Sequence, residues 1–334
     1  MPNLNDIAEW LKDRNGTPAE MRIYGDEFRA VKIQKHVLAF PCSHTSNPFY
    51  FENNLNYKLF DVVCNYSNGK PSLIFCSTRK STVAACEQLS LDCKNGNTNR
   101  FVVSKLLAAE LQQSRMSISD KKLGEFIELG LAYHHGGTCI EDRQIIEGLF
   151  LKGKLAVIAT TSTLAVGINL PAHLVIIKGT QQYIAGKNKN YSNMDMLQMI
   201  GRAGRPQFDN YGVAVVLTTV DHKEECENMI LGREIVESSL HLNLIEHLNA
   251  EVVLGTIKSV KDAMNWLRST FLYVRIKKNP AHYKLKNCSK EQSILSAETR
   301  LEAIFMTDID QLDENQIVTR NDMGHISTSG FNFH

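Results

Sequence analysis

LAVIATTSTLAVGINLPAHLVIIKG, residues 155–179, contains two short apolar runs, 155–160 and 173–179, on either side of a turn rich in Ser and Thr. Runs this short and this apolar are typical of parallel strands that are buried on both faces of a sheet. Similar runs and intervening helical patterns alternate along the chain, with strand-like segments at 33–40, 71–79 and 211–218 and helical spacing at 55–66, 139–150, 193–203 and 221–231. This alternation predicts an α/β fold, a parallel sheet with helices on both faces.

The alternation stops at about residue 235, which predicts a second domain. Helical patterns follow, and the chain ends on two short strand-like pieces, QIVTR (316–320) and GHISTSGF (324–331). Helices followed by a small hairpin suggest a winged-helix module. The predicted helices cover 236–256, 259–279 and about 293–307, and the expected organisation is a lead-in segment at 1–30, the α/β domain at 31–235 and a winged-helix domain at 236–334.

Composition excludes several classes of protein. Lys plus Arg number 37 and Asp plus Glu number 36, so any basic surface for nucleic acid has to be local. No apolar run approaches the roughly 18 residues that a membrane span requires, and the N-terminus lacks the pattern of a signal peptide. The eight cysteines are scattered without a CxxC pair. We therefore expect no membrane, no metal site and no disulfide framework, and a reducing compartment.

The segment LQMIGRAGRPQF (197–208) is the strongest candidate for chemistry. Gln198, Arg202 and Arg205 are spaced four and three residues apart, which predicts that they share one face of a helix. Two guanidinium groups suit the oxygens of a triphosphate. The alternative is an exposed helix with ordinary surface arginines, but two glycines would then interrupt that helix at a cost of about 1 kcal/mol each.

Four segments together resemble the second motor domain of superfamily-two DExH helicases, in the superkiller-like branch, and most of all the meiotic crossover-promoting DNA helicases. In chain order they are SLIFCSTRK (72–80), similar to motif IV, AYHHGG (132–137), similar to motif IVa, ATTSTLAVGINLPA (159–172), similar to motif V, and QMIGRAGRP (198–206), similar to motif VI. Each motif is weak alone, and four in order are specific. The resemblance covers nearly the whole chain and implies a RecA-like domain followed by a winged-helix domain.

The resemblance implies two functional faces. Arg202 and Arg205 would be arginine fingers that stabilise charge on the γ-phosphate, with Gln198 beside them. Gly167 and Asn169 would lie near the nucleotide and couple it to the nucleic acid. Phosphates of a nucleic-acid strand would contact a second set of residues, namely Thr78, Arg79, His134, His135, Thr160, Thr161 and Ser162.

Ordinary structural roles remain open for these residues. A run of Ser and Thr after a strand is also a common helix N-cap, and an HH pair is often a turn residue plus a core histidine. The insert at 179–195 occupies the place of a strand-separating hairpin, where Tyr183 or Tyr191 would stack on a base beside Lys187, or where a plain surface hairpin would stand. YVRIKKNPAHYK (273–284) is basic and aromatic, and fits either a nucleic-acid surface or a solvated helix end.

Two helicase motifs are missing. The sequence contains no G-x-x-x-x-G-K-[ST] phosphate cradle and no DExH box. We therefore expect the C-terminal half of a helicase, either a fragment, a short isoform or a truncated gene model, with an incomplete winged-helix domain. ATP and Mg²⁺ would serve the full-length parent and would not bind stably to this chain alone, which should be inactive unless an N-terminal RecA-like domain is supplied in cis or in trans.

The hypothesis is an ATP-dependent 3′–5′ DNA helicase of meiotic recombination, located in the nucleus and acting on single-stranded or branched DNA. Two alternatives remain. The motor motifs grip the backbone and not the bases, so they are equally compatible with an RNA helicase of the spliceosomal or exosome-linked type. A non-enzymatic module that binds nucleic acid or protein is the third possibility.

Overall fold

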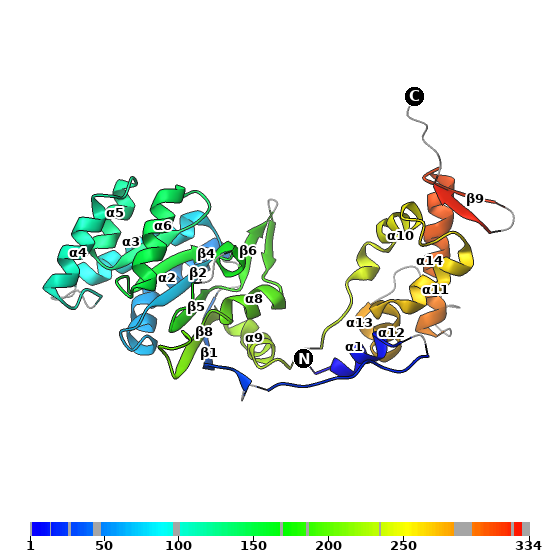
Figure 1. Ribbon diagram of the computed structural model, residues 1–334, viewed down its shortest axis with the longest axis horizontal. Helices are drawn as coiled ribbons and strands as arrows, with labels where there is room; N and C mark the ends of the chain where they lie inside the picture. Colours follow the sequence, from blue (N-terminus) through cyan, green and yellow to red (C-terminus); the bar gives the residue numbers. More distant parts are fainter. Residues whose placement is uncertain are drawn as a thin grey trace, which may run out of the picture. The chain divides into compact units, whose positions relative to one another are not determined.

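The computed structural model describes residues 2–13, 15–25, 28–42, 48–95, 101–167, 170–184, 187–233, 235–283, 296–321 and 324–328. The chain forms two units (Figure 1). The larger unit is Tyr24–Arg233, and the smaller unit combines Met1–Ile23 with Glu234–His334. The N-terminal residues, which the sequence suggested only as a lead-in, are thus a part of the smaller unit.

The larger unit is built on a six-stranded sheet in which every neighbouring pair is parallel. Its order is β1 (Lys32–Phe40), β8 (Tyr211–Thr219), β5 (Leu174–Lys178), β2 (Ser72–Cys76), β4 (Val157–Thr161) and β3 (Leu131–His134). Every residue of β2 and β5 is buried, as the unbroken apolar runs predict. Ile74 in β2 lies opposite Ile176 of β5 and Ala159 of β4.

Helices cover both faces of this sheet (Figure 1). With right-handed crossovers, the connections that run toward β3 place α2 (Pro48–Tyr66) and α3 (Arg79–Asn95) on one face. The connections that run back place α6 (Ile140–Leu151) and α8 (Asn193–Ile200) on the other. The remaining helices of this unit are α4 (Lys105–Arg115), α5 (Lys121–Glu128), α7 (Thr163–Gly167) and α9 (Lys223–Ile230). The predicted α/β fold is confirmed.

Two glycines allow the chain to pass close to itself beside β8. Gly204 has φ +89°, and a Cβ there would lie 2.5 Å from Val31 Cγ1. A Cβ on Gly212 would lie 2.3 Å from the backbone nitrogen of Gly204. The segment around Gly204 therefore packs backbone to backbone against the start of β8, which no larger residue permits.

We predict that Gly212→Ala destabilises the larger unit by at least the 1–3 kcal/mol or so that is typical of overpacking, because backbone has to move. Gly148→Ala is the control: this glycine lies within α6, nothing stands within 4 Å of its added Cβ, and alanine should stabilise the helix by about 0.5–1 kcal/mol. Urea unfolding followed by far-UV circular dichroism measures both. Equal effects of the two substitutions would contradict the close approach.

The smaller unit packs helices around a core of its own. Its members are α1 (Leu4–Trp10), α10 (Leu244–Val253), α11 (Val260–Ser269), α12 (Phe271–Lys278), α13 (Pro280–Tyr283) and α14 (Ala297–Glu314), followed by the antiparallel strands β9 (Val318–Arg320) and β10 (Ile326–Thr328). Leu248, Leu267, Ile276 and Phe305 are among the buried residues. A bridge between Ser259 and His325 joins the hairpin to the start of α11.

Two of the long helices predicted here are wrong in their bounds. The helix predicted to begin at residue 236 begins at Leu244, after a short 3-10 turn at 240–242. The helix predicted for 259–279 breaks at Thr270, whose hydroxyl accepts from Tyr273 N at 3.3 Å and donates to Leu267 O at 2.7 Å. Thr270 thereby ends α11 and caps α12. Its hydroxyl competes with the backbone for the hydrogen bonds of a continuous helix, and the periodicity of apolar residues does not reveal this competition.

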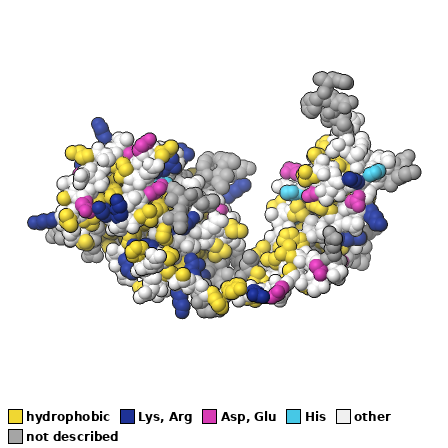
Figure 2. All heavy atoms as spheres, in the orientation of Figure 1, with side chains coloured by type: hydrophobic (Ala, Val, Ile, Leu, Met, Phe, Trp, Pro, Cys, Tyr) yellow, Lys and Arg dark blue, Asp and Glu magenta, His cyan; other side chains and the backbone are white. Residues whose placement is uncertain are grey.

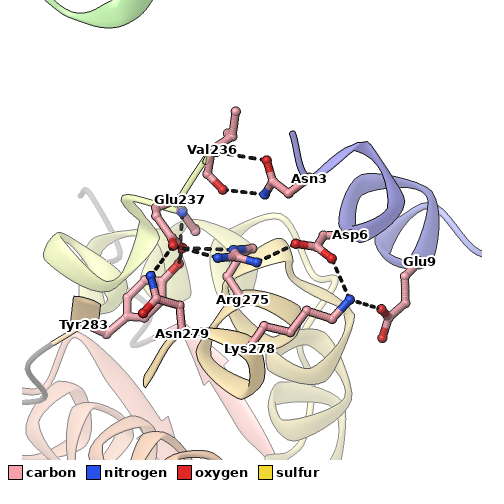
Figure 3. A network of polar contacts seen from close by, with 10 residues as sticks. Asn3, Asp6, Glu9, Val236, Glu237, Arg275, Lys278, Asn279 and Tyr283 are labelled. Atoms are coloured by element: carbon pink, nitrogen blue, oxygen red, sulfur yellow. Dashed lines mark hydrogen bonds and ion pairs between the residues drawn. The ribbon is translucent and has the colours of Figure 1, made fainter. Parts of the chain in front are cut away.

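Polar contacts fasten the N-terminal helix to this unit (Figure 3). The amide of Asn3 exchanges two hydrogen bonds with the backbone of Val236, at 2.9 and 3.0 Å. Asp6 accepts from the buried guanidinium of Arg275 and from Lys278 Nζ, the latter at 2.6 Å. Trp10 adds a hydrogen bond to the backbone oxygen of Ser269 at 2.8 Å. Partners some 270 residues away thus hold α1 in place.

The basic stretch at 273–284 is largely neutralised within the unit. Arg275 is 3% exposed and also donates from Nε and Nη2 to the two oxygens of Glu237, at 2.9 and 2.7 Å. Lys277 pairs with Glu298 at 2.9 Å, and Lys278 pairs with Asp6. Its described cations therefore serve folding, and the nucleic-acid alternative for this segment loses its main support.

We predict an acid-labile smaller unit. Burial alone would raise the pKa of Glu237, but hydrogen bonds from Arg275, Asn279 and Tyr283 outweigh it and lower the pKa to about 2. A carboxylate whose pKa is lower in the folded state than in the unfolded chain stabilises the folded state. This stabilisation is fully present above the unfolded pKa of about 4.3, and it is lost as the pH falls toward 2. Glu237→Gln should flatten this loss. The two tryptophans, Trp10 and Trp266, both lie in this unit, so fluorescence-monitored unfolding reports on it alone.

The control is Glu246→Gln, a change at an exposed glutamate of α10. It should leave the pH profile of wild type intact. A profile that stays steep between pH 4.5 and 2 in Glu237→Gln would contradict the role given to this carboxylate.

Candidate nucleic-acid groove and arginine turn

A groove of about 1020 Å³ lies in the larger unit where β2 and β4 end. Its walls come from the start of α2, the start of α3, the segment after β3 and the segment after β4. They include Glu52, Ser77, Thr78, Arg79, Lys80, Ser81, Gly136, Thr161, Ser162, Thr163 and Gln182. The carboxyl ends of parallel strands are the usual ligand-binding edge of such a sheet, and here three of the four motifs meet.

Motif IV contributes the start of α3. Thr78 caps this helix, because its hydroxyl oxygen accepts from Ser81 N at 3.1 Å. Arg79 and Lys80 follow, both exposed, and within the described part of the chain no carboxylate pairs with either. A helix N-terminus with two available cations is suited to a phosphate group.

Arg79 also brings motif IV to motif IVa. A Cβ on Gly137 would lie 3.3 Å from Arg79 Nη1, and one on Gly136 would lie 3.6 Å from Nη2. The guanidinium therefore lies over the two glycines, which leave room for it. This one side chain therefore joins two motifs that are some 55 residues apart in the sequence.

The two histidines of motif IVa have different surroundings. His134 is 4% exposed and its Nε2 lies 2.8 Å from Glu147 Oε1, so its expected contact with a phosphate does not fit its placement. His135 is half-buried, stacks on Tyr133, and accepts from Gly137 N at 3.1 Å through Nδ1. Burial, with Arg79 nearby, lowers the pKa of His135, so the ring is neutral at physiological pH and offers only a hydrogen bond.

Motif V divides in the same way. Thr160 is fully buried and its hydroxyl donates to Thr161 O at 3.3 Å, which removes it from the expected phosphate contacts. Thr161, Ser162 and Thr163 line the groove. The hydroxyls of Thr161 and Thr163 lie 2.9 Å apart. The residues of motif V that reach the groove are therefore Thr161, which ends β4, and the two that follow it, whereas Thr160 is buried in the packed sheet.

One groove residue, Glu52, and a buried residue behind it, Lys178, were not identified from the sequence. Glu52 accepts from Ser77 N at 3.2 Å and from Ser81 Oγ at 2.5 Å. The buried Lys178, at the end of β5, donates to Asn56 Oδ1 at 2.6 Å and lies 3.7 Å from Glu52. Together they hold the β2–α3 turn, and neither belongs to a motif; only the lysine that ends an apolar run was a usable signal.

The insert between motifs V and VI is a hairpin of β6 (Gln181–Ile184) and β7 (Lys187–Asn190), with Tyr183 opposite Asn188. The side chains of Tyr183 and Lys187 lie outside the described residues, as does Asn169. Gly167 is the last residue of α7. Tyr191 is 7% exposed with its hydroxyl 3.5 Å from Cys76 O, so it packs in the core and does not stack on a base.

Motif VI is not one helical face, and that prediction is wrong. Helix α8 ends at Ile200 with Gly201 as its C-cap, so Gln198 is on the helix and the two arginines follow it. The chain then pairs with Ala172, two residues before β5: Ala203 bridges Ala172, and Gly204 N donates to Ala172 O at 2.7 Å. Because Ala172 precedes β5, the segment Arg202–Asp209, the arginine turn, lies at the amino ends of the strands, opposite the groove.

The two arginines have different partners. Arg202 donates through Nε to Ala165 O, in α7, at 3.0 Å. Arg205 donates to the buried carboxylate of Asp209 through Nε, at 2.9 Å, and through Nη2, at 3.2 Å. Gln198 is exposed. Arg202 therefore ties motif VI to motif V, whose other end lines the groove.

Charge is distributed locally over the surface. Figure 2 shows lysine and arginine side chains scattered among acidic ones, without a continuous basic field on the visible faces. Among the residues that the structure describes, no helix has the length and apolarity of a membrane span, and no cluster of three or more His, Cys, Asp or Glu side chains suits a metal ion.

Two family models match the chain, and they follow each other in the order of the two units. The helicase conserved C-terminal domain matches residues 55–207, and a winged helix-turn-helix domain matches 237–317. The first spans most of the groove and most of the arginine turn, and the second spans most of the helices of the smaller unit. The predicted winged-helix domain is thereby confirmed.

Relatives extend this likeness to nearly the whole chain. A probable ATP-dependent DNA helicase, HFM1 of Xenopus tropicalis, is 46% identical over 93% of this chain and 23% of its own length. The ATP-dependent DNA helicase MER3 of Saccharomyces cerevisiae is 44% identical over 86% of this chain and 23% of its own. The DExH-box ATP-dependent RNA helicase DExH14 of Arabidopsis thaliana is 35% identical over 93% of this chain and 14% of its own length. The chain thus contains a helicase conserved C-terminal domain followed by a winged helix-turn-helix domain. It spans less than a quarter of the length of these relatives.

We predict that Arg79→Gln weakens binding of single-stranded DNA by this chain and lowers the salt dependence of binding by about one phosphate contact. The reason is that Arg79 is an available cation at the groove. Lys152→Gln, a change at an exposed lysine beyond α6, is the matched control. Fluorescence anisotropy across a salt series measures both, and equal slopes for the two variants would place the DNA elsewhere.

Proposed function

We propose that this chain is the second motor domain and the winged-helix domain of an ATP-dependent DNA helicase that unwinds DNA 3′ to 5′ in meiotic recombination, in the nucleus. The observation that supports it most is the arrangement of the motifs: a groove with two exposed cations, Arg79 and Lys80, at one end of the sheet and an arginine turn at the other, joined through Arg202 and Ala165. Relatives named DNA helicases, at 44–46% identity, support the choice of substrate.

The groove is proposed to hold the backbone of a single DNA strand. Arg79, Lys80 and the N-terminus of α3 would attract phosphates, and Thr161 and Ser162 would donate hydroxyl hydrogens. Such contacts do not distinguish bases, as a helicase that moves along any sequence requires. His134 and Thr160 would act behind this surface by fixing the strand ends.

The arginine turn is proposed to complete an ATP site on another domain. Of the Arg205 guanidinium, Nε and Nη2 are engaged by Asp209, and no described residue accepts from Nη1. That edge fits a phosphoryl oxygen, but the sequence has no phosphate cradle and no DExH acid. ATP and Mg²⁺ would therefore be held by an N-terminal RecA-like domain, in cis or in trans, and Arg205 would stabilise charge that develops there.

The RNA-helicase alternative rests on the 35% identical RNA helicase of Arabidopsis thaliana. Contacts to the phosphate backbone do not distinguish DNA from RNA. A contact to the 2′-hydroxyl, which only RNA has, would distinguish them. Unwinding of matched DNA and RNA duplexes by a longer protein that also contains a first motor domain separates the two proposals, and a preference for RNA would favour the alternative.

We predict that this chain alone releases no phosphate from ATP, and that in a longer protein with a first motor domain in cis Arg205→Ala lowers kcat by about 10³–10⁵-fold. KM should change less, because the finger acts mainly on the transition state. Arg205→Lys should restore little, since an ammonium lacks the planar fork. Near wild-type kcat in Arg205→Ala would overturn the assignment of motif VI.

A further inference from the structure

A buried carboxylate stands behind the arginine turn. The side chain of Asp209 is fully buried, and its two oxygens receive donors from two parts of the chain. Arg205 donates from its backbone N and its guanidinium, and Lys70 donates from Nζ at 2.9 Å. His173 Nδ1 lies 3.3 Å away. Lys70 and His173 come from the segments that lead into β2 and β5, so the cluster lies at the amino ends of the strands.

The turn itself is shaped to return Asp209 to Arg205. Pro206 follows the arginine, Gln207 has φ +74°, and Phe208 N donates to Arg205 O at 3.1 Å. Proline followed by a residue with positive φ is typical of a type II turn, in which glycine would be less strained than glutamine. The ring of Phe208 lies 5.4 Å from the centre of the guanidinium. Gln207 thus adopts a strained conformation, and the turn closes a five-residue loop from Arg205 to Asp209.

The hydrogen bonds to Asp209 are directional. They engage the Nε–Nη2 edge of Arg205 in a two-point contact, which fixes the plane of the guanidinium as well as its position. The side chain of Arg205 is 19% exposed, so one part of it still reaches solvent. A planar fork that is held by one edge presents its other edge, Nη1, in a fixed direction.

Lys70 explains how a buried carboxylate remains charged beside a finger that has to interact with phosphate. Burial alone would raise the pKa of Asp209, but hydrogen bonds from Arg205 and Lys70 bring it well below its usual range. When part of the charge of Arg205 is directed to a phosphate, Lys70 still balances Asp209. The carboxylate therefore stays ionised and keeps its contact with the guanidinium.

We propose that Asp209 is a positioning residue for the Arg205 finger: it holds the guanidinium by the Nε–Nη2 edge so that Nη1 is directed to the phosphoryl oxygens, and Lys70 is the counter-ion that keeps the carboxylate available. This inference rests on the proposed function of Arg205. Asp209 itself touches no nucleotide; it acts through the arginine.

The first test is a double-mutant cycle on ATP hydrolysis in the longer protein. Asp209→Asn should lower kcat at least 10-fold with less than a 3-fold change in KM, and should have no further effect in an Arg205→Ala background. Lys70→Met should lower kcat less, and Lys70→Arg should restore it. Equal effects of Asp209→Asn with and without Arg205 would mean a merely structural role and would overturn the proposal.

The second test needs no ATP and uses this chain alone. Nuclear magnetic resonance of the arginine Nε–H groups reports the rotation of each guanidinium, and the signal of Arg205 should show slow rotation in wild type and fast rotation in Asp209→Asn. Unchanged rotation would overturn the positioning role. If Asp209→Asn frees the guanidinium while Arg205→Ala retains full kcat, the positioning stands and the proposed function of Arg205 fails.

Asp142→Asn is the matched control for both tests. Asp142 is a buried carboxylate on α6, beside the edge strand β3, and accepts from Ser119 N at 2.9 Å and Asp120 N at 3.1 Å. Its loss should lower the stability of the larger unit and leave the Arg205 signal and kcat unchanged. A matching change in the Arg205 signal would show that any buried aspartate has this effect, and would contradict the proposal.

Discussion

Parallel pairing is the constraint on which the arrangement of the larger unit depends. Six strands run in one direction, so each connection has to carry the chain from the carboxyl ends back to the amino ends. The connection from β4 to β5 begins with Thr161 and Ser162 in the groove and ends with Ala172, which bridges Ala203 beside the arginine turn. One short segment therefore touches both the groove and the arginine turn. Arg202 reinforces that link by donating to Ala165 in the middle of it.

The smaller unit depends on a different interaction, an ion pair between distant segments. Arg275 is buried between Asp6 and Glu237, so the first helix of the chain and the residues after the larger unit meet at one guanidinium. Removing one member of such a buried pair leaves an uncompensated charge, which typically costs about 3–5 kcal/mol. The same geometry explains why a stretch that is basic in sequence contributes little free positive charge, whereas Arg79 and Lys80 at the groove remain available.

Much of the fold was predictable because buried parallel strands are short and apolar, and these strands are. The segments at 33–40, 173–179 and 211–218 each match one strand of the sheet, and the helical spacing at 55–66 falls within α2, where Leu59, Val62 and Val63 are buried. The errors have local causes. Motif VI was expected on one helical face, but Gly201 ends α8, and Gly204 serves a close approach of two backbones. Periodicity carries no information on either.

The candidate site was predictable only as far as its motifs. Arg79, Thr161 and Ser162 do converge on one groove. Thr160 and His134 have the right residue type in the right motif, yet the strand directs them into the interior. Glu52, Lys178 and Asp209 were missed because each acts as a partner of another polar group, and such pairing appears only once the chain is folded.

The separation of the two ends is the central claim, and hydrogen–deuterium exchange with and without a single-stranded DNA oligonucleotide tests it most directly. The account predicts slower exchange on DNA binding at the backbone amides of residues 77–81, 136–138 and 161–163, which line or adjoin the groove. Residues 202–209, at the opposite end of the sheet, should exchange as before. Protection confined to 202–209, or to the smaller unit, would contradict it.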